Sequence, residues 1–320
     1  MKKYYDLFNG DADGIVSLHQ YRMHFPQHSE LITGVKRDVE LLRHVTEVKD
    51  SCVTVFDVSH KTNKEHARQV LANNNHLVWF DHHQADMYIP GPGLSMNIDT
   101  SPDCCTSMLV DSHVDGLYRP WTIVGAYGDN LHDSVKEMCP LAYLDDHKLT
   151  MLQEIGETLN YNGYGNVESD LTVHPKDVYI DMSDYESPFD YRNQSSIYDK
   201  IYHQKCMDSR ELEASDVLHQ CDVGRVVLLP DSKASVRFSG IYSNRLSLNN
   251  PDQAFVILTS VDDDTYRVSI RAPYNRPNGA SSLAENFPTG GGRERAAGVN
   301  SLPKNKLRLL IDLMKAQFAR

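Results

Sequence analysis

The 320-residue chain is predicted to be an α/β protein, with a parallel-sheet N-terminal domain and a smaller α/β C-terminal domain facing it across a cleft. Two observations predict this class. Over roughly the first 130 residues, short apolar runs alternate with helix-like stretches, a pattern typical of a parallel sheet covered by helices. After a less patterned segment, strand-like runs begin again near residue 222, which indicates a second domain.

The N-terminal alternation has four strand-like runs and three helix-like stretches. The strands are predicted at 4–8 (YYDLF), 30–35 (ELITGV), 52–58 (CVTVFDV) and 76–81 (HLVWFD). The helices are predicted at 14–25, 38–48 and 62–74, the last with Thr62 as its N-cap. Acidic residues follow or end three of the strands, namely Asp11, Asp57 and Asp81. Ligands of parallel sheets gather at this carboxyl edge.

The sequence of the second half of the chain predicts a helical linker followed by the smaller domain. A helix is expected over 147–159, and the domain boundary lies between 215 and 216. Beyond it, strands are predicted at 224–230, 253–261 and 265–272, with helices at 241–249 and 303–318. The domains are therefore 1–215 and 216–320.

Composition limits the cellular setting and the partners. No run approaches the ~18 apolar residues of a membrane helix, and the N-terminus carries no signal-peptide pattern. Six cysteines without C-x-x-C spacing suggest free thiols in the cytoplasm. A net charge of −12 argues against a grip on long nucleic acid. The sequence does not indicate an oligomeric state.

The stretch LFNGDADGIVSLHQ, residues 7–20, has three interpretations. Asn9, Asp11, Asp13 and Gly14 match the first ligands and the glycine of a calcium loop. That loop requires Glu at its twelfth position, where this chain has Gln20, and a helix before it rather than a strand. A solvated turn is the second interpretation, since Asp and Gly are common in turns. Chemistry by the Asp pair is the third.

The rest of the chain favours chemistry, because four acidic or His-bearing motifs follow in order. They are DAD (Asp11, Asp13), FDVSH (Asp57), FDHH (Asp81, His82, His83) and AYGDN (Asp129). Carboxylates with imidazole suit Mn²⁺, Mg²⁺ or Zn²⁺. Two Asp residues two positions apart can serve neighbouring ions, which in phosphoryl hydrolysis lie roughly 3.5–4 Å apart.

This order of motifs resembles the DHH phosphoesterases, and SIRAPYN…GGGRERAAG resembles the glycine-rich substrate domain that accompanies many of them. The resemblance implies two divalent ions, with Mn²⁺ first and Mg²⁺ as the alternative. Asp11 and Asp57 would hold one ion, and Asp57 would bridge to the second, held with Asp13, His82 and Asp129. It also implies that Asp81 orients His82 and that His83 contacts the scissile phosphate or assists the leaving group.

In the second domain, the resemblance implies a site for a terminal phosphate or base. It would consist of Arg271 and the backbone of Gly290, Gly291 and Gly292. Arg293 stands where the family has His, and Arg295 follows; either Arg can clamp a phosphate or address a guanine edge.

A second departure is near the first ion, where the family has His or Asp shortly before the D-x-D motif. This chain has Asn9 and Leu7 at the positions two and four before Asp11. A neutral Asn is a weaker ligand, so the first ion is expected to be loosely held.

The expected function is hydrolysis of short linear oligoribonucleotides, chiefly dinucleotides, to nucleoside 5′-monophosphates. The guanine dinucleotide pGpG is an attractive special case because of Arg293. One alternative is a cyclic dinucleotide phosphodiesterase, which needs room for a closed ring. Another is a nucleotide-binding sensor that has lost turnover through Asn9. The protein is not expected to bind a membrane.

Overall fold

The computed structural model describes residues 2–85, 92–142 and 144–319. The chain divides into two compact units, 1–204 and 205–320. The division falls within helix α9 (Ser196–Glu213), and the predicted boundary between 215 and 216 lies just after this helix ends. In the described part of the chain, no helix is long and apolar enough to cross a membrane.

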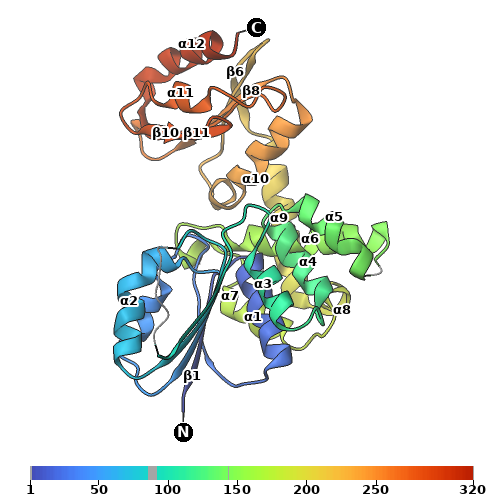
Figure 1. The fold of residues 1–320 in the computed structure, drawn as a ribbon. Helices are drawn as coiled ribbons and strands as arrows, with labels where there is room; N and C mark the ends of the chain where they lie inside the picture. Colours follow the sequence, from blue (N-terminus) through green and yellow to red (C-terminus); the bar gives the residue numbers. More distant parts are fainter. Residues whose placement is uncertain (1, 86–91, 143, 320) are drawn as a thin grey trace. The chain divides into compact units, whose positions relative to one another are not determined.

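The first unit is built on a five-stranded parallel sheet in the order β2-β1-β3-β4-β5 (Figure 1). The predicted parallel α/β class is therefore confirmed. The strands are β1 (Tyr4–Phe8), β2 (Glu30–Ile32), β3 (Cys52–Phe56), β4 (His76–Asp81) and β5 (Leu94–Ile98). Strand β5 was not predicted, since its sequence LSMNI has weak strand character and none of its residues is fully buried.

Helices cover both faces of this sheet, with α2 on one face and α1 and α3 on the other (Figure 1). This explains why the central strands are nearly all apolar rather than alternating. The helices are α1 (Ala12–His24), α2 (His60–Ala72), α3 (Thr106–His113), α4 (Arg119–Gly128), α5 (His132–Ala142), α6 (Asp146–Gly163), α7 (Pro175–Met182) and α8 (Pro188–Gln194), with 3₁₀ turns η1 (Leu41–Val45) and η2 (Glu168–Asp170).

The prediction of a helix at 38–48 was wrong, because the structure has the 3₁₀ turn η1 there and no α-helix. The side chain of Asn63 explains the difference. Its Oδ1 accepts a hydrogen bond from the Leu42 amide (3.2 Å), and its Nδ2 donates to the Val39 carbonyl (2.5 Å). These bonds take the place of helical backbone bonds. The helix predicted from a Thr62 cap begins earlier, at His60, with Ser59 as the N-cap residue.

The second unit has a six-stranded mixed sheet in the order β10-β11-β9-β8-β7-β6, in which only β7 and β8 are parallel. Its strands are β6 (Asp216–Cys221), β7 (Gly224–Leu228), β8 (Ala254–Ser260), β9 (Thr265–Arg271), β10 (Gly290–Gly292) and β11 (Ala296–Pro303). Its helices are α10 (Lys233–Asn249), α11 (Ala280–Ala284) and α12 (Leu307–Phe318), with the 3₁₀ turn η3 (Lys304–Lys306). The core between sheet and helices includes Val256, Ile270 and Leu310.

The predicted free thiols are confirmed for the cysteines whose side chains the structure describes: Cys52, Cys104, Cys105, Cys206 and Cys221. Two of these, Cys104 and Cys105, immediately precede helix α3. They lie beside the candidate site described below.

His19, on the buried side of α1, is expected to make the stability of the protein depend on pH. Its ring packs edge-on against Trp121 and its Nε2 donates to the Tyr185 carbonyl (3.0 Å). Burial lowers the pKa of His19 to about 4. As the pH falls, the unfolded chain, with an ordinary His pKa of about 6.5, takes up a proton on His19 before the folded protein does. This contribution to stability is therefore complete above about pH 6.5 and is lost as the pH falls toward 4.

The expected size of the His19 effect is up to about 3 kcal/mol between these two limits. His19→Gln keeps a donor for the Tyr185 carbonyl but cannot titrate. Urea unfolding at pH 7 and pH 4.5 should show a shallower pH dependence in this variant than in the wild type. An identical pH dependence in the two proteins would show that His19 does not contribute.

Candidate metal centre

The carboxyl ends of three neighbouring parallel strands meet at one edge of the first sheet. Strand β1 leads through Asn9 and Gly10 to Asp11 and Asp13, β3 leads to Asp57, and β4 ends at Asp81. Side chains far apart in the sequence therefore lie together, as predicted. Helix α4 adds Asp129, its C-cap residue, to the same group.

Asp13 is fully buried in the first turn of α1, and two backbone amides hold its carboxylate. Its Oδ2 accepts from the Thr106 amide (2.7 Å) and its Oδ1 from the Ser107 amide (2.8 Å). Both amides belong to the first turn of α3, where helix N–H groups lack helical partners and favour an anion. The side chain therefore has a fixed orientation, with lone pairs left for a cation.

Asp57 has a left-handed backbone conformation, with φ of 57°. Asp and Asn tolerate this conformation better than other residues with a side chain. The carboxylate is buried, and its Oδ1 accepts from the Thr106 hydroxyl (3.3 Å). Burial, and then the negative charge of Asp11, raise the pKa of Asp57 well above its usual range. A carboxyl held among other carboxyls in this way favours a nearby cation.

His82 points its Nε2 atom at this group of carboxylates. Its Nδ1 lies 3.0 Å from the Cys104 carbonyl, which can only accept, so Nδ1 carries the proton. In the neutral ring, Nε2 is then free to act as a ligand. Nε2 lies 3.4 Å from Asp57 Oδ1 and 3.3 Å from Asp129 Oδ2.

The carboxylates of the group raise the pKa of two of its members, His82 and Asp129. Burial disfavours the His82 cation, but hydrogen bonding to Asp57 and the nearby carboxylates outweigh burial and raise the pKa of His82 to about 10. Burial, together with Asp13 and Asp11, raises the pKa of Asp129 to about 7. Protons are thus bound tightly where a metal cation would otherwise balance the charge.

Two sets of side chains could hold a metal among the described residues. One is Asp13, His82 and Asp129, and the other is Asp57, His82 and His83; within each set the candidate ligand atoms lie within 4.8 Å of one another. The first set, with Asp57 beside it, has the oxygen and imidazole donors that suit Mn²⁺ or Mg²⁺. The residues present therefore fit a divalent ion at this position.

His83 differs from His82 in what holds it. Its Nδ1 donates to Asp81 Oδ1 (2.7 Å), and its backbone amide donates to the same oxygen (3.2 Å). The hydrogen bond that His83 donates to Asp81 raises the pKa of His83. Because Nδ1 is occupied by Asp81, that atom is not available to a metal. The predicted role of Asp81 in orienting His82 is wrong: Asp81 orients His83, and the Cys104 carbonyl orients His82.

Asp11 belongs to neither candidate ligand set, although its carboxyl interacts with that of Asp57. As the N-cap of α1, its Oδ1 accepts from the Gly14 amide (3.1 Å). Its Oδ2 lies 2.6 Å from Nζ of Lys36, a residue that the sequence patterns did not single out. Burial opposes the charge of Asp11, but Lys36 lowers the pKa of Asp11 overall.

The two positions before Asp11 that the family resemblance singled out offer no strong ligand. Leu7 is fully buried in the sheet core. Asn9 donates from Nδ2 to the Lys36 carbonyl (3.4 Å), and its buried Oδ1 has no hydrogen-bond partner among the described residues.

In the second unit, Arg271 is held in place at the end of β9 without a carboxylate. Its Nε donates to Asn244 Oδ1 (3.1 Å), and its Nη1 donates to Ser269 Oγ (2.9 Å) and to the Ile270 carbonyl (3.2 Å). No ion pair with Arg271 occurs among the residues that the structure describes. Burial lowers the pKa of Arg271, since no anion offsets the cost.

The glycine run 290–292 forms strand β10, paired with β11. A Cβ on Gly290 would lie 1.8 Å from the Ala284 carbonyl oxygen, and Gly292 has φ of 146°. Packing and conformation therefore require glycine at these two positions, whereas Gly291 is exposed with open space around it. A role of this backbone in binding an anion stays a prediction.

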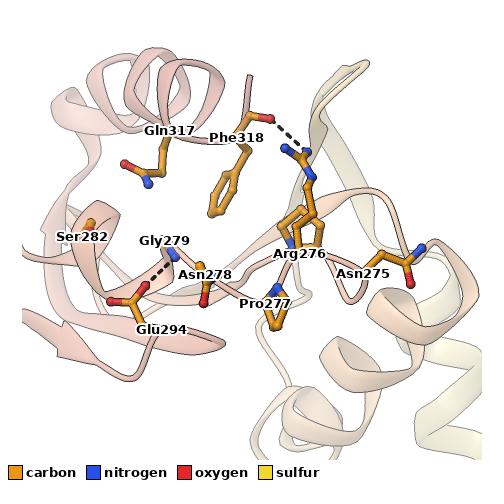
Figure 2. A pocket seen from close by; sticks show the side chains of 10 residues that line it. Asn275, Arg276, Pro277, Asn278, Gly279, Ser282, Glu294, Gln317 and Phe318 are labelled. Carbon is orange, nitrogen blue, oxygen red and sulfur yellow. Dashed lines mark hydrogen bonds between the residues drawn. The ribbon is translucent and has the colours of Figure 1, made fainter. Parts of the chain in front are cut away.

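The loop after β10 carries Arg293, Glu294 and Arg295, all exposed. Arg295 lies over the Tyr274 ring, 5.2 Å from its centre. Glu294 accepts from the Gly279 amide (2.7 Å) and the Ser281 hydroxyl (2.6 Å), and borders a pocket of about 540 Å³ (Figure 2). The opposite wall includes Arg276, which donates to the Phe318 carbonyl (3.3 Å). Of the predicted substrate residues, none lines this pocket.

No protein-family model and no curated protein matches the chain. Solved structures do. The exonuclease RecJ bound to manganese has a TM-score of 0.58 and 15% identity, over 100% of this chain and 90% of that one. The pGpG-specific phosphodiesterase PggH from Vibrio cholerae has a TM-score of 0.58 and 13% identity, over 98% of this chain and 100% of that one. A DHH domain from a member of the s1p family of ribosomal proteins has a TM-score of 0.56 and 13% identity, over 98% of this chain and 86% of that one. The chain therefore has the fold of the DHH proteins, as its motifs predicted.

Proposed function

We propose that this protein is a divalent-metal-dependent phosphodiesterase that hydrolyses short linear oligoribonucleotides, chiefly dinucleotides such as pGpG, to nucleoside 5′-monophosphates. The observation that carries the proposal is the meeting of Asp13, Asp57, His82 and Asp129, with the His82 ring held in the ligand tautomer. Mn²⁺ is the first candidate ion and Mg²⁺ the second. The similar folds of manganese-bound RecJ and of PggH support this proposal.

Each group in the site has a separate task in this proposal. The bound ion would supply Lewis-acid stabilisation of negative charge on the phosphate. Asp13, fixed by two amides, and the His82 ring, fixed by the Cys104 carbonyl, would hold that ion. His83, with its pKa raised through Asp81, would present a protonated ring to the phosphate or to the leaving oxygen.

The preference for short substrates rests on charge. A net charge of −12 repels each further phosphate of a long strand. The basic groups proposed to bind substrate are few: Arg271, Arg293 and Arg295. Of these, Arg271 is held in place without an acidic partner, so it is suited to one phosphate.

A length series tests this function. With Mn²⁺ present, 5′-phosphorylated RNAs of two, three, five and ten residues should be cleaved at rates that fall steeply with length. Arg293→Ala should lower kcat/KM on the dinucleotide on the order of 10-fold or more. Arg308→Ala, which removes an exposed Arg paired with Asp312 on α12, is the matched control and should behave as the wild type.

Each alternative gives a different result in the same assay. Equal rates on the two-mer and the ten-mer would replace the short-substrate proposal with a RecJ-like exonuclease. Faster hydrolysis of a cyclic dinucleotide than of the linear one would favour the cyclic phosphodiesterase. Dinucleotide binding without turnover, with Mn²⁺ bound, would favour the sensor.

A further inference from the structure

Lys36 places an ammonium group inside the carboxylate cluster, at the position where the family resemblance expects the first ion. Its Nζ lies 2.6 Å from Asp11 Oδ2, 3.7 Å from Asp129 Oδ1 and 3.1 Å from Asn160 Oδ1. Two carboxylates and a neutral amide thus surround one positive charge, with about a quarter of the Lys36 side chain exposed (27%).

The backbone fixes this placement as much as the side chain does. The Lys36 amide donates to the Gly163 carbonyl (2.8 Å), and the Lys36 carbonyl accepts from Asn9 Nδ2 (3.4 Å). The loop before Lys36 packs so closely on the D-x-D loop that a Cβ on Gly10 would lie 1.9 Å from the Gly34 oxygen. The backbone at Lys36 is therefore held close to the D-x-D loop.

The side chain also has an aromatic partner. Nζ lies over the Tyr164 ring, 5.6 Å from its centre, a geometry that attracts a cation. Burial opposes the charge of Lys36, but Asp11 and its neighbours outweigh burial and raise the pKa of Lys36 well above its ordinary value.

An ammonium and a divalent ion cannot both occupy this place. A carboxylate oxygen binds such an ion at about 2.0–2.2 Å, and the Nζ at 2.6 Å from Asp11 Oδ2 fills that space. The second Asp11 oxygen accepts from the Gly14 amide, which leaves Lys36 as the cationic partner of this carboxylate among the described residues. By contrast, the candidate ligand atoms of Asp13, His82 and Asp129 lie within 4.8 Å of one another, and of these three residues Lys36 pairs only with Asp129 in the described part of the chain, at 3.7 Å.

We propose that this protein binds one divalent ion per chain, at Asp13, Asp57, His82 and Asp129, and that the Lys36 ammonium replaces the second ion at Asp11. The two-ion site predicted from the sequence is thereby revised. The proposal rests on the metal dependence of the proposed function but not on its substrate.

The test counts ions without using turnover. Protein freed of metal by chelation is titrated with Mn²⁺ by calorimetry, and the loaded protein is studied by electron paramagnetic resonance, which distinguishes an isolated Mn²⁺ from a spin-coupled pair. The wild type should bind one Mn²⁺ with the isolated signal. Lys36→Met, close in shape but uncharged, should bind a second and give the coupled signal. Lys36→Arg should stay at one ion.

Lys136→Met is the matched control, since Lys136 is exposed and pairs only locally with Asp133. It should bind one ion, as the wild type does. Two coupled ions in the wild type would overturn the proposal, and so would a folded Lys36→Met protein that still binds one. If Lys36→Met does not fold, the wild-type count and signal still decide between one ion and two.

The proposed function can fail separately. A wild type that binds one isolated Mn²⁺ but cleaves no nucleotide would leave this inference standing and overturn the phosphodiesterase. A wild type that binds no Mn²⁺ would overturn both.

Discussion

Replacing Asp57 with Asn should reduce turnover on the order of 10³- to 10⁴-fold without destabilising the protein. The substitution removes a carboxylate that belongs to one candidate ligand set and lies 3.4 Å from His82, which both sets share. Asn still accepts the hydrogen bond from Thr106 and still tolerates the left-handed backbone at this position. It also removes a carboxyl whose pKa is raised by burial and then by its acidic neighbours, so the metal-free protein should unfold at a higher temperature.

Three measurements on Asp57→Asn separate these effects: dinucleotide turnover with Mn²⁺, Mn²⁺ affinity, and thermal unfolding in chelator. Asp57→Ala is the comparison variant. It should lose activity equally, but it should also lose about 1–2 kcal/mol of stability because Ala disfavours a left-handed backbone. Near-normal turnover in Asp57→Asn would contradict the proposed metal centre. A lower unfolding temperature for Asp57→Asn would show that this carboxylate stabilises the fold.

Replacing Arg271 with Ala should lower kcat/KM on a 5′-phosphorylated dinucleotide on the order of 10- to 100-fold. The guanidinium is already oriented by Asn244 and Ser269, so little side-chain freedom is lost when a phosphate binds. A substrate that lacks the 5′-phosphate should be affected much less. Arg271→Lys should recover only part of the loss, because a planar fork fits phosphate better than a single ammonium does.

Arg267 provides the matched control, since it lies on the same strand and is exposed. Arg267→Ala should cleave both dinucleotides at wild-type rates. If Arg271→Ala lost the same factor with and without the 5′-phosphate, the residue would act through the packing of β9 rather than through the phosphate.

The positions of the acidic site residues followed from the sequence because a parallel sheet brings successive strand ends to one edge. Recognising the strands before Asp11, Asp57 and Asp81 was enough to group those residues. The hydrogen-bond partners of the individual site residues could not be predicted from the sequence. The Cys104 carbonyl and the Thr106 and Ser107 amides are backbone groups, which every residue type offers, so no sequence pattern marks them.

Lys36 and the missing helix at 38–48 show a second limit. Both depend on contacts between segments far apart in the sequence. Gly163 and Asn160, which hold Lys36, are more than a hundred residues away in the sequence. Asn63 binds backbone groups of the 38–48 segment that a helix would otherwise use. Local periodicity predicted a helix there because it cannot include a side chain from another segment that competes for the same backbone groups.

Cys104, whose carbonyl holds His82, and its neighbour Cys105 also place two thiol groups beside the proposed metal ligands. Burial, and then nearby acids, raise the pKa of the Cys104 thiol to about 12 and that of Cys105 well above its usual range. Thiolate, not thiol, reacts with oxidants and alkylating agents. Because burial is the largest cause, a bound cation would not remove this protection. The two thiols next to the proposed metal ligands are therefore expected to react slowly with alkylating agents and oxidants.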